Sequence, residues 1–308
     1  MNIGINGFGR IGRLALRNII NQKGLNIVAI NDLFPAEYLA YLLKYDSTHG
    51  KLHADISYDS KHIIINDKKI RVSCEKDPSK IKWGDVGADY IIESSGFFLT
   101  QELCKKHIEC GAKKVVMSAP PKDNTPMYVM GVNHNDYNEG FNIVSNASCT
   151  TNCLAPIVEI LDRHFGIENG VVSTIHAVTA SQNAIDSPNL KNWRLGRGAF
   201  QNIIPSTTGA ANAVGKILPK LKGKLTGMSF RVPTANVSIV DLSVNLKSET
   251  SYKEICSIMQ SESKSKRYGG ILGYSDENLV STDFLSDSRT SILDANSGIE
   301  ISPSFFKI

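Results

Sequence analysis

The chain has 308 residues, of which 42% are hydrophobic and 21% are charged. Its 34 basic and 30 acidic residues give a formal net charge of +4, and the basic residues are scattered along the chain. This composition is typical of a globular protein with two domains, each able to bury a core of its own. It argues against a nucleic-acid or membrane partner, whereas small anionic substrates are compatible with it.

The six cysteines lie at irregular spacing without a C-x-x-C pair, which indicates neither a disulfide framework nor a zinc ribbon. Free cysteines suit a reducing compartment. A strand-like segment begins directly at the N-terminus, and no apolar run approaches the roughly 20 residues of a membrane span. We therefore expect a cytoplasmic protein.

The first predicted strand, from Asn2 to Asn6, is followed directly by the segment Gly7-Phe8-Gly9-Arg10-Ile11-Gly12. A helical pattern comes next, and its expected buried face carries Ile11, Leu14, Ala15 and Ile19. A G-x-G-x-x-G segment between a strand and a helix is the arrangement of a dinucleotide site. Gly7 permits the tight turn, Gly9 lets the backbone approach a pyrophosphate, and Gly12 allows the helix to pack closely.

The next predicted strand, Leu25 to Ile30, ends in Asn31-Asp32, and Asp32 lies 20 residues beyond Gly12. An acidic side chain at this offset accepts hydrogen bonds from the ribose hydroxyls of the adenosine and repels a 2′-phosphate. The sequence therefore favours NAD over NADP.

Further elements are those of a doubly wound sheet. A hairpin is predicted around Asn66-Asp67, and two strands follow at Tyr90 to Ile92 and Val115 to Met117. Ligands bind at the carboxyl ends of parallel strands. We expect the residues at those ends to gather round the cofactor, namely Asn31, Asp32, Ser95, Gly96, Ser118 and Ala119.

The segment Ser145 to Cys153 is small and polar, and a helical pattern of Leu154, Ile157, Val158, Leu161 and Phe165 follows it. Ser148 is the best candidate for the helix N-cap, which places Cys149 in the first turn. Unpaired backbone N–H groups and the helix dipole favour a thiolate there. Cys149 is therefore a candidate nucleophile, whereas Cys153 is expected to be a small buried hydrophobe.

The strand predicted from Val171 to Ile175 leads into His176. A lone histidine is more often structural than catalytic. A cysteine at a helix start and a histidine at a strand end nevertheless form the pairing that a thiolate and its general base require.

Several longer motifs follow in order: Trp193 to Gly198, Ile204 to Ala211, Leu225 to Met228 and Phe230 to Thr234. Together with the glycine-rich turn and Ser145 to Pro156, they make the chain resemble the phosphorylating glyceraldehyde-3-phosphate dehydrogenases over essentially all of its length. The resemblance implies an α/β protein. Residues 1–148 would form a Rossmann-type, doubly wound parallel sheet domain that binds NAD. Residues 149–308 would form an α+β catalytic domain with a mostly antiparallel or mixed sheet, without the final C-terminal helix of the family.

The resemblance also implies a reaction. The Cys149 thiolate would attack the aldehyde carbon of glyceraldehyde 3-phosphate, and His176 would take the hydroxyl proton as hydride leaves for the nicotinamide. Inorganic phosphate would then displace the thioester, giving 1,3-bisphosphoglycerate in glycolysis.

The family's binding residues transfer to matching positions of this chain. Thr179 and Arg231 would hold the phosphate of the substrate, and the attacking phosphate would meet Ser148, Thr150, Thr208 and Gly209. For the threonines, capping and strand packing are an alternative; for Arg231 the alternative is a partly buried ion pair. The residues implied for NAD are Gly7, Phe8, Gly9, Arg10, Ile11, Asn31, Asp32, Lys76, Ser95, Gly96 and Ser118.

The family forms homotetramers in which the loop around residues 178–202 reaches toward a neighbour's cofactor. We therefore expect a homotetramer. Two other functions stay open at this point: an erythrose-4-phosphate dehydrogenase paralogue, and an NAD-binding or interaction protein impaired by its short C-terminus. No metal is expected, because Cys149, Cys153 and His176 lack a fourth ligand at recognisable spacing.

Overall fold

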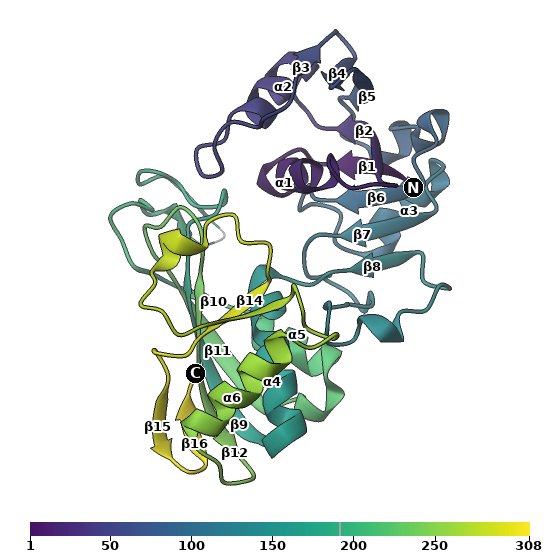
Figure 1. The fold of residues 1–308 in the computed structure, drawn as a ribbon. Coiled ribbons are helices and arrows are strands. Elements are labelled where there is room, and N and C mark those ends of the chain that lie inside the picture. The colour runs from purple at the N-terminus through teal and green to yellow at the C-terminus, as the bar shows by residue number, and fades with distance from the viewer. Residues whose placement is uncertain (191) are drawn as a thin grey trace. The chain divides into compact units, whose positions relative to one another are not determined.

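The structure is a computed structural model that describes residues 1–190 and 192–308. The chain forms two compact units (Figure 1). The first comprises Met1–Tyr128 and Asp136–Ala147, and the second comprises Val129–Asn135 and Ser148–Ile308. Among the described residues, no helix combines the length and the apolar character needed to traverse a lipid bilayer.

In the first unit, the described strands form one sheet in the order β3-β4-β5-β2-β1-β6-β7-β8. Their bounds are β1 (Asn2–Asn6), β2 (Asn26–Asn31), β3 (Ile56–Tyr58), β4 (His62–Ile65), β5 (Lys68–Ser73), β6 (Tyr90–Glu93), β7 (Lys114–Met117) and β8 (Ile143–Ser145). The strands from β5 to β8 in this order pair in parallel, and β3 and β4 pair antiparallel to their neighbours. The predicted Rossmann-type sheet is confirmed.

The helices of this unit are α1 (Arg10–Ile19), α2 (Ala36–Lys44) and α3 (Gln101–Glu109). The Thr100 hydroxyl accepts a hydrogen bond from Leu103 N at the start of α3. Asn66 and Asp67 join β4 to β5 with φ of 47° and 65°. This left-handed pair closes a two-residue hairpin whose twist matches that of its strands, so the predicted hairpin is confirmed.

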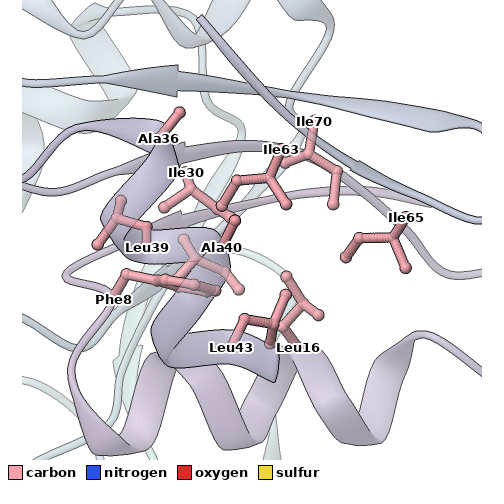
Figure 2. Packing of buried hydrophobic residues seen from close by; sticks show 11 residues of the cluster. Phe8, Leu16, Ile30, Ala36, Leu39, Ala40, Leu43, Ile63, Ile65 and Ile70 are labelled. Atoms are coloured by element: carbon pink, nitrogen blue, oxygen red, sulfur yellow. The ribbon is translucent and has the colours of Figure 1, made fainter. Parts of the chain in front are cut away.

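The prediction for the buried face of α1 was wrong at Ile11 and missed Leu16, whereas Leu14, Ala15 and Ile19 are half-buried. Ile11 is 53% exposed, whereas Leu16 is fully buried among the apolar side chains of β2, α2 and β4 (Figure 2). The cause is Gly12, where a Cβ would lie 2.2 Å from the carbonyl oxygen of Gly7. This close approach turns Gly12 and Leu16, one helical turn apart, toward the sheet, and Ile11 points away from it.

The second unit contains a six-stranded sheet in the order β10-β11-β9-β12-β16-β15 within the described residues. The strands are β9 (Ile167–His176), β10 (Ile204–Thr207), β11 (Leu225–Arg231), β12 (Ile239–Leu246), β15 (Ile299–Ser302) and β16 (Phe305–Lys307), and a separate pair is β13 (Leu272–Ser275) and β14 (Ser291–Asp294). Only β9 and β11 pair in parallel in the six-stranded sheet as described. The predicted mixed sheet is therefore confirmed.

The helices of the second unit are α4 (Cys149–Phe165), α5 (Ala210–Ile217) and α6 (Tyr252–Ser263). Both α4 and α5 pack on the six-stranded sheet, and α6 packs on α4 and β13 (Figure 1). All five apolar residues predicted for the buried face of α4 are buried, as expected. The opposite face of the sheet leaves Val171, Met228 and Ile239 exposed by 52%, 44% and 57%.

The corrected orientation of α1 gives a stability prediction. Leu16→Ala is expected to lower the free energy of unfolding by about 2–5 kcal/mol, because it opens a cavity in a closed core. Ile11→Ala serves as the matched control on the same helix and should change it by less than about 0.5 kcal/mol. Urea unfolding of both variants without NAD measures the difference. Equal losses would contradict this orientation of α1.

Candidate active site

The start of α4 is built as predicted. Ser148 has extended backbone angles, and its hydroxyl oxygen accepts a hydrogen bond from Thr151 N at 3.1 Å, so its prediction as the N-cap is confirmed. Cys149 is the first residue of the helix and is exposed. Its sulfur therefore lies beside backbone N–H groups that have no partner within the helix, at the positive end of the helix dipole.

The Cys149 sulfur lies 3.3 Å from Nε2 of His176, the last residue of β9. Partial loss of water around the sulfur would raise the pKa of Cys149, but the hydrogen bond and charge of His176 outweigh it. The hydroxyl of Thr150, 4.0 Å from the sulfur, acts in the same direction. The net effect lowers the pKa of Cys149, as a nucleophilic thiolate requires.

Arg231 ends β11, and the parallel register of β11 and β9 sets it beside His176. Its Nη1 lies 2.6 Å from Nδ1 of His176 and donates to the carbonyl oxygen of Ala177 at 3.2 Å. Burial lowers the pKa of Arg231, and the negative charge of a Cys149 thiolate opposes that shift. The sequence allowed Arg231 to form an ion pair, but its guanidinium instead contacts the imidazole of His176.

Nδ1 of His176 has two neighbours with opposite requirements. The carbonyl oxygen of Ala177, 2.7 Å away, only accepts a hydrogen bond, whereas the guanidinium of Arg231 only donates one. A protonated Nδ1 can therefore donate a hydrogen bond to Ala177, whereas an unprotonated Nδ1 can accept one from Arg231. The position of Arg231 and the tautomer of His176 are thus linked.

The remaining residues expected to bind phosphate make their hydrogen bonds elsewhere. The Thr179 hydroxyl lies 3.0 Å from that of Ser181, and the Thr208 hydroxyl accepts from Ala210 N at the start of α5. Thr208 directly precedes Gly209, which is the exposed N-cap residue of α5, and α5 has no side-chain cap.

In the first unit, the glycine-rich turn is held from several sides. Gly7 has φ of +88°, and a Cβ there would lie 2.4 Å from Ser95 N. The carboxylate of Asp32 accepts a hydrogen bond from Phe8 N at 2.6 Å, and the Ser94 hydroxyl donates to the Gly7 carbonyl at 2.7 Å. The ends of β1, β2 and β6 are therefore tied together as the parallel sheet predicted.

The space in front of this turn suits a pyrophosphate. A Cβ on Gly9 would meet no atom within 4 Å, and Gly9 is the N-cap of α1, which has no side-chain cap. Its first backbone N–H groups are thus left for an anion. Phe8 is 1% exposed and packs in the apolar core of this unit.

The other residues expected at the cofactor range from buried through half-buried to exposed. Asn31 is 4% exposed, and the Ser118 hydroxyl donates to the carbonyl oxygen of Glu93. Arg10 forms an ion pair with Asp46. The residues on the surface are Ile11, Lys76 and Gly96.

Sequence reasoning missed a group of buried polar residues beneath these strand ends: Asn6, Trp83, Glu93 and His107. Asn6 and Glu93 end parallel strands, which is a signal that the sequence carries. Trp83 and His107 have no local pattern that would relate them to a ligand.

Comparison with known proteins gives consistent matches. Residues 1–101 match the model of the NAD binding domain of glyceraldehyde 3-phosphate dehydrogenase, and residues 148–308 match the model of its C-terminal domain. Over all 308 residues, the chain is 54% identical to a glyceraldehyde-3-phosphate dehydrogenase of Ogataea parapolymorpha and covers 91% of it. It is 53% identical to the glyceraldehyde-3-phosphate dehydrogenase of Salmonella typhimurium and to glyceraldehyde-3-phosphate dehydrogenase A of Escherichia coli, and covers 92% of each.

The sulfur–imidazole pair predicts a change in thiol reactivity. His176→Asn removes the group that lowers the pKa of Cys149, so the thiolate should form only at higher pH and alkylation at neutral pH should slow. The pH profile of iodoacetamide alkylation, read by mass spectrometry, measures this midpoint. Cys153→Ala is the control and should leave the profile unchanged, because burial raises the pKa of the Cys153 thiol. An unshifted midpoint in His176→Asn would contradict the pairing.

Proposed function

Because the chain belongs to the family of NAD-dependent glyceraldehyde-3-phosphate dehydrogenases, we propose that Cys149 and His176 carry out the oxidation of glyceraldehyde 3-phosphate and its coupling to phosphate. The observation that carries this assignment is the 3.3 Å contact between the Cys149 sulfur and Nε2 of His176 at the start of α4. We further propose that residues 1–148 form the NAD-binding domain and residues 149–308 the catalytic domain.

The proposed chemistry proceeds in two stages. His176 takes the thiol proton of Cys149, the thiolate forms a bond to the aldehyde carbon, and the imidazolium gives the proton to the aldehyde oxygen. His176 then takes the proton of this hydroxyl as hydride leaves the carbon and the carbonyl forms again. NAD, when bound, supplies the hydride acceptor. A phosphate oxygen then attacks the thioester carbon, the carbon–sulfur bond breaks, and the acyl phosphate leaves a free Cys149 thiolate.

Arg231 takes part in this scheme through the tautomer of His176. To accept a proton at Nε2, the neutral ring must carry its other proton on Nδ1, where the Ala177 carbonyl lies 2.7 Å away. Arg231 must then leave Nδ1. The phosphate of the substrate offers a guanidinium a stronger, bidentate partner. Substrate binding through Arg231 therefore prepares His176 as a base.

Further residues are proposed for the two phosphates and for NAD. Thr179 joins Arg231 at the substrate phosphate, and Ser148, Thr150, Thr208 and Gly209 receive the attacking phosphate. NAD is held at the glycine-rich turn, with the carboxylate of Asp32 at the ribose hydroxyls. The residues proposed around it are Gly7, Phe8, Gly9, Arg10, Ile11, Asn31, Lys76, Ser95, Gly96 and Ser118.

We also propose a homotetramer in the cytoplasm. The outer face of the second unit's sheet exposes Val171, Met228 and Ile239, and the segment after β9 exposes Leu190 and Trp193 by 92% and 82%. Apolar exposure of this extent is typical of an interface with another chain. Lys191 of the same segment lies outside the described residues. The six cysteines are all free thiols, which suits a reducing compartment.

The nucleophile assignment predicts the outcome of one substitution. Cys149→Ser should lower the rate of NADH formation from glyceraldehyde 3-phosphate by at least about 10³-fold, because a serine hydroxyl is far less ionised at neutral pH. Cys153→Ser is the matched control one helical turn away and should retain activity. Turnover followed at 340 nm should require phosphate or arsenate, and erythrose 4-phosphate should give a lower specificity constant. Normal turnover by Cys149→Ser would exclude this nucleophile.

The tetramer is tested by the mass of the particle in solution and by a double substitution that introduces two lysines. Sedimentation equilibrium is expected to give four chains per particle. Val171→Lys combined with Ile239→Lys should produce smaller particles, because it places two charges on the apolar face that would have to be buried. Val280→Lys, at a residue 64% exposed outside this sheet, is the control. A monomeric wild type would contradict the proposed assembly.

A further inference from the structure

Five polar or amphipathic side chains are buried beneath the carboxyl ends of β1, β2 and β6. They are at most 4% exposed: Asn6, Asn31, Trp83, Glu93 and His107. Trp83 begins a short 3-10 turn, and His107 lies on α3. Such a group is costly in a protein interior unless its hydrogen bonds are complete.

The hydrogen bonds among Trp83, His107 and Glu93 all run from donor to acceptor in that order. The indole N–H of Trp83 donates to Nδ1 of His107 at 3.0 Å. Because an indole only donates, Nδ1 must be unprotonated, and the proton of the neutral imidazole is on Nε2. Nε2 lies 3.0 Å from Oε2 of Glu93 and donates to it. Trp83 thus fixes the tautomer that the Glu93 carboxylate requires.

Glu93 accepts from four donors. Besides His107, Asn6 Nδ2 donates to Oε2 at 2.6 Å. The backbone N–H and the hydroxyl of Ser95 donate to Oε1 at 2.8 Å and 2.5 Å. Both oxygens are fully used in this arrangement.

The carboxylate reaches the cofactor turn through two neighbours. Ser95, held by Glu93, is the residue on which Gly7 packs, backbone against backbone. Asn6 accepts from Asn31 Nδ2 at 2.8 Å, and Asn31 in turn binds both backbone groups of Glu75 at 2.9 Å. One buried side chain is therefore connected to three segments: those that follow β1 and β6, and, through Asn6 and Asn31, the segment at Glu75 that follows β5.

We propose that Glu93 and His107 are positioning residues for NAD, which hold the glycine-rich turn and the segment at Ser95 in their binding geometry before the cofactor arrives. The inference rests on the NAD site of the proposed function. A turn that is already in place loses less conformational entropy on binding, so the benefit appears as cofactor affinity. Neither side chain touches the reacting groups in this role.

Calorimetric titration of the apoprotein with NAD tests the proposal. Glu93→Gln turns one acceptor into a donor that faces other donors, and it should raise the Kd for NAD by about tenfold or more. The pH midpoint of Cys149 alkylation, which reports on the second unit, should stay that of the wild type. A Kd within twofold of the wild type in Glu93→Gln would overturn the proposal.

Two substitutions of His107 give the matched comparison. His107→Gln can present its oxygen to Trp83 and its N–H to Glu93, and should keep the Kd within about threefold. His107→Leu satisfies neither neighbour and should raise the Kd by about tenfold. Cys104→Ala, at a fully buried residue of α3 outside the network, controls for lost stability and should bind NAD normally. Equal affinities of His107→Gln and His107→Leu would also overturn the proposal, whereas a wild type that fails to bind NAD would contradict the proposed function itself.

Discussion

The contact between the Cys149 sulfur and the His176 imidazole is the interaction on which the chemistry of this protein depends. A thiol that loses water holds its proton more firmly, and only a nearby positive or hydrogen-bonding partner reverses this. The fold brings the two groups together, because α4 begins at Cys149 and β9 ends at His176. The lowered pKa of Cys149 follows from the hydrogen bond and charge of that imidazole, which outweigh the effect of burial.

Arg231 adds a constraint that is visible only in the folded chain. The register of β9 and β11 forces its guanidinium against Nδ1 of the imidazole, where it competes with the Ala177 carbonyl. A guanidinium in that position requires an Nδ1 without a proton, which places the proton of a neutral ring on Nε2. An anion that attracts the guanidinium removes the competition. A single side chain thereby relates the phosphate of a substrate to the protonation of the base.

The sequence predicts those features whose causes are local. The N-cap at Ser148, the hairpin at Asn66 and the strand that ends at His176 depend on a few neighbouring residues, and all three are present. The exposed position of Ile11 was missed because it depends on the close approach of Gly12 to the Gly7 carbonyl, which periodicity does not record. The pairing of Trp83 with His107 spans 24 residues and was likewise beyond local patterns.

The Glu93 carboxylate in the first unit and the Cys149 thiolate in the second are stabilised in a related way, each beside the end of a parallel strand. Glu93 is stabilised by the N–H and hydroxyl groups of Ser95, two residues beyond the end of β6, and by buried amide and imidazole N–H groups. Cys149 is stabilised by a helix start and by an imidazole at the end of β9. In each case fixed donors serve better than a mobile lysine, because their positions are set by the fold before any ligand binds. The unpaired N–H groups at the start of α1 extend the same principle to the pyrophosphate of NAD.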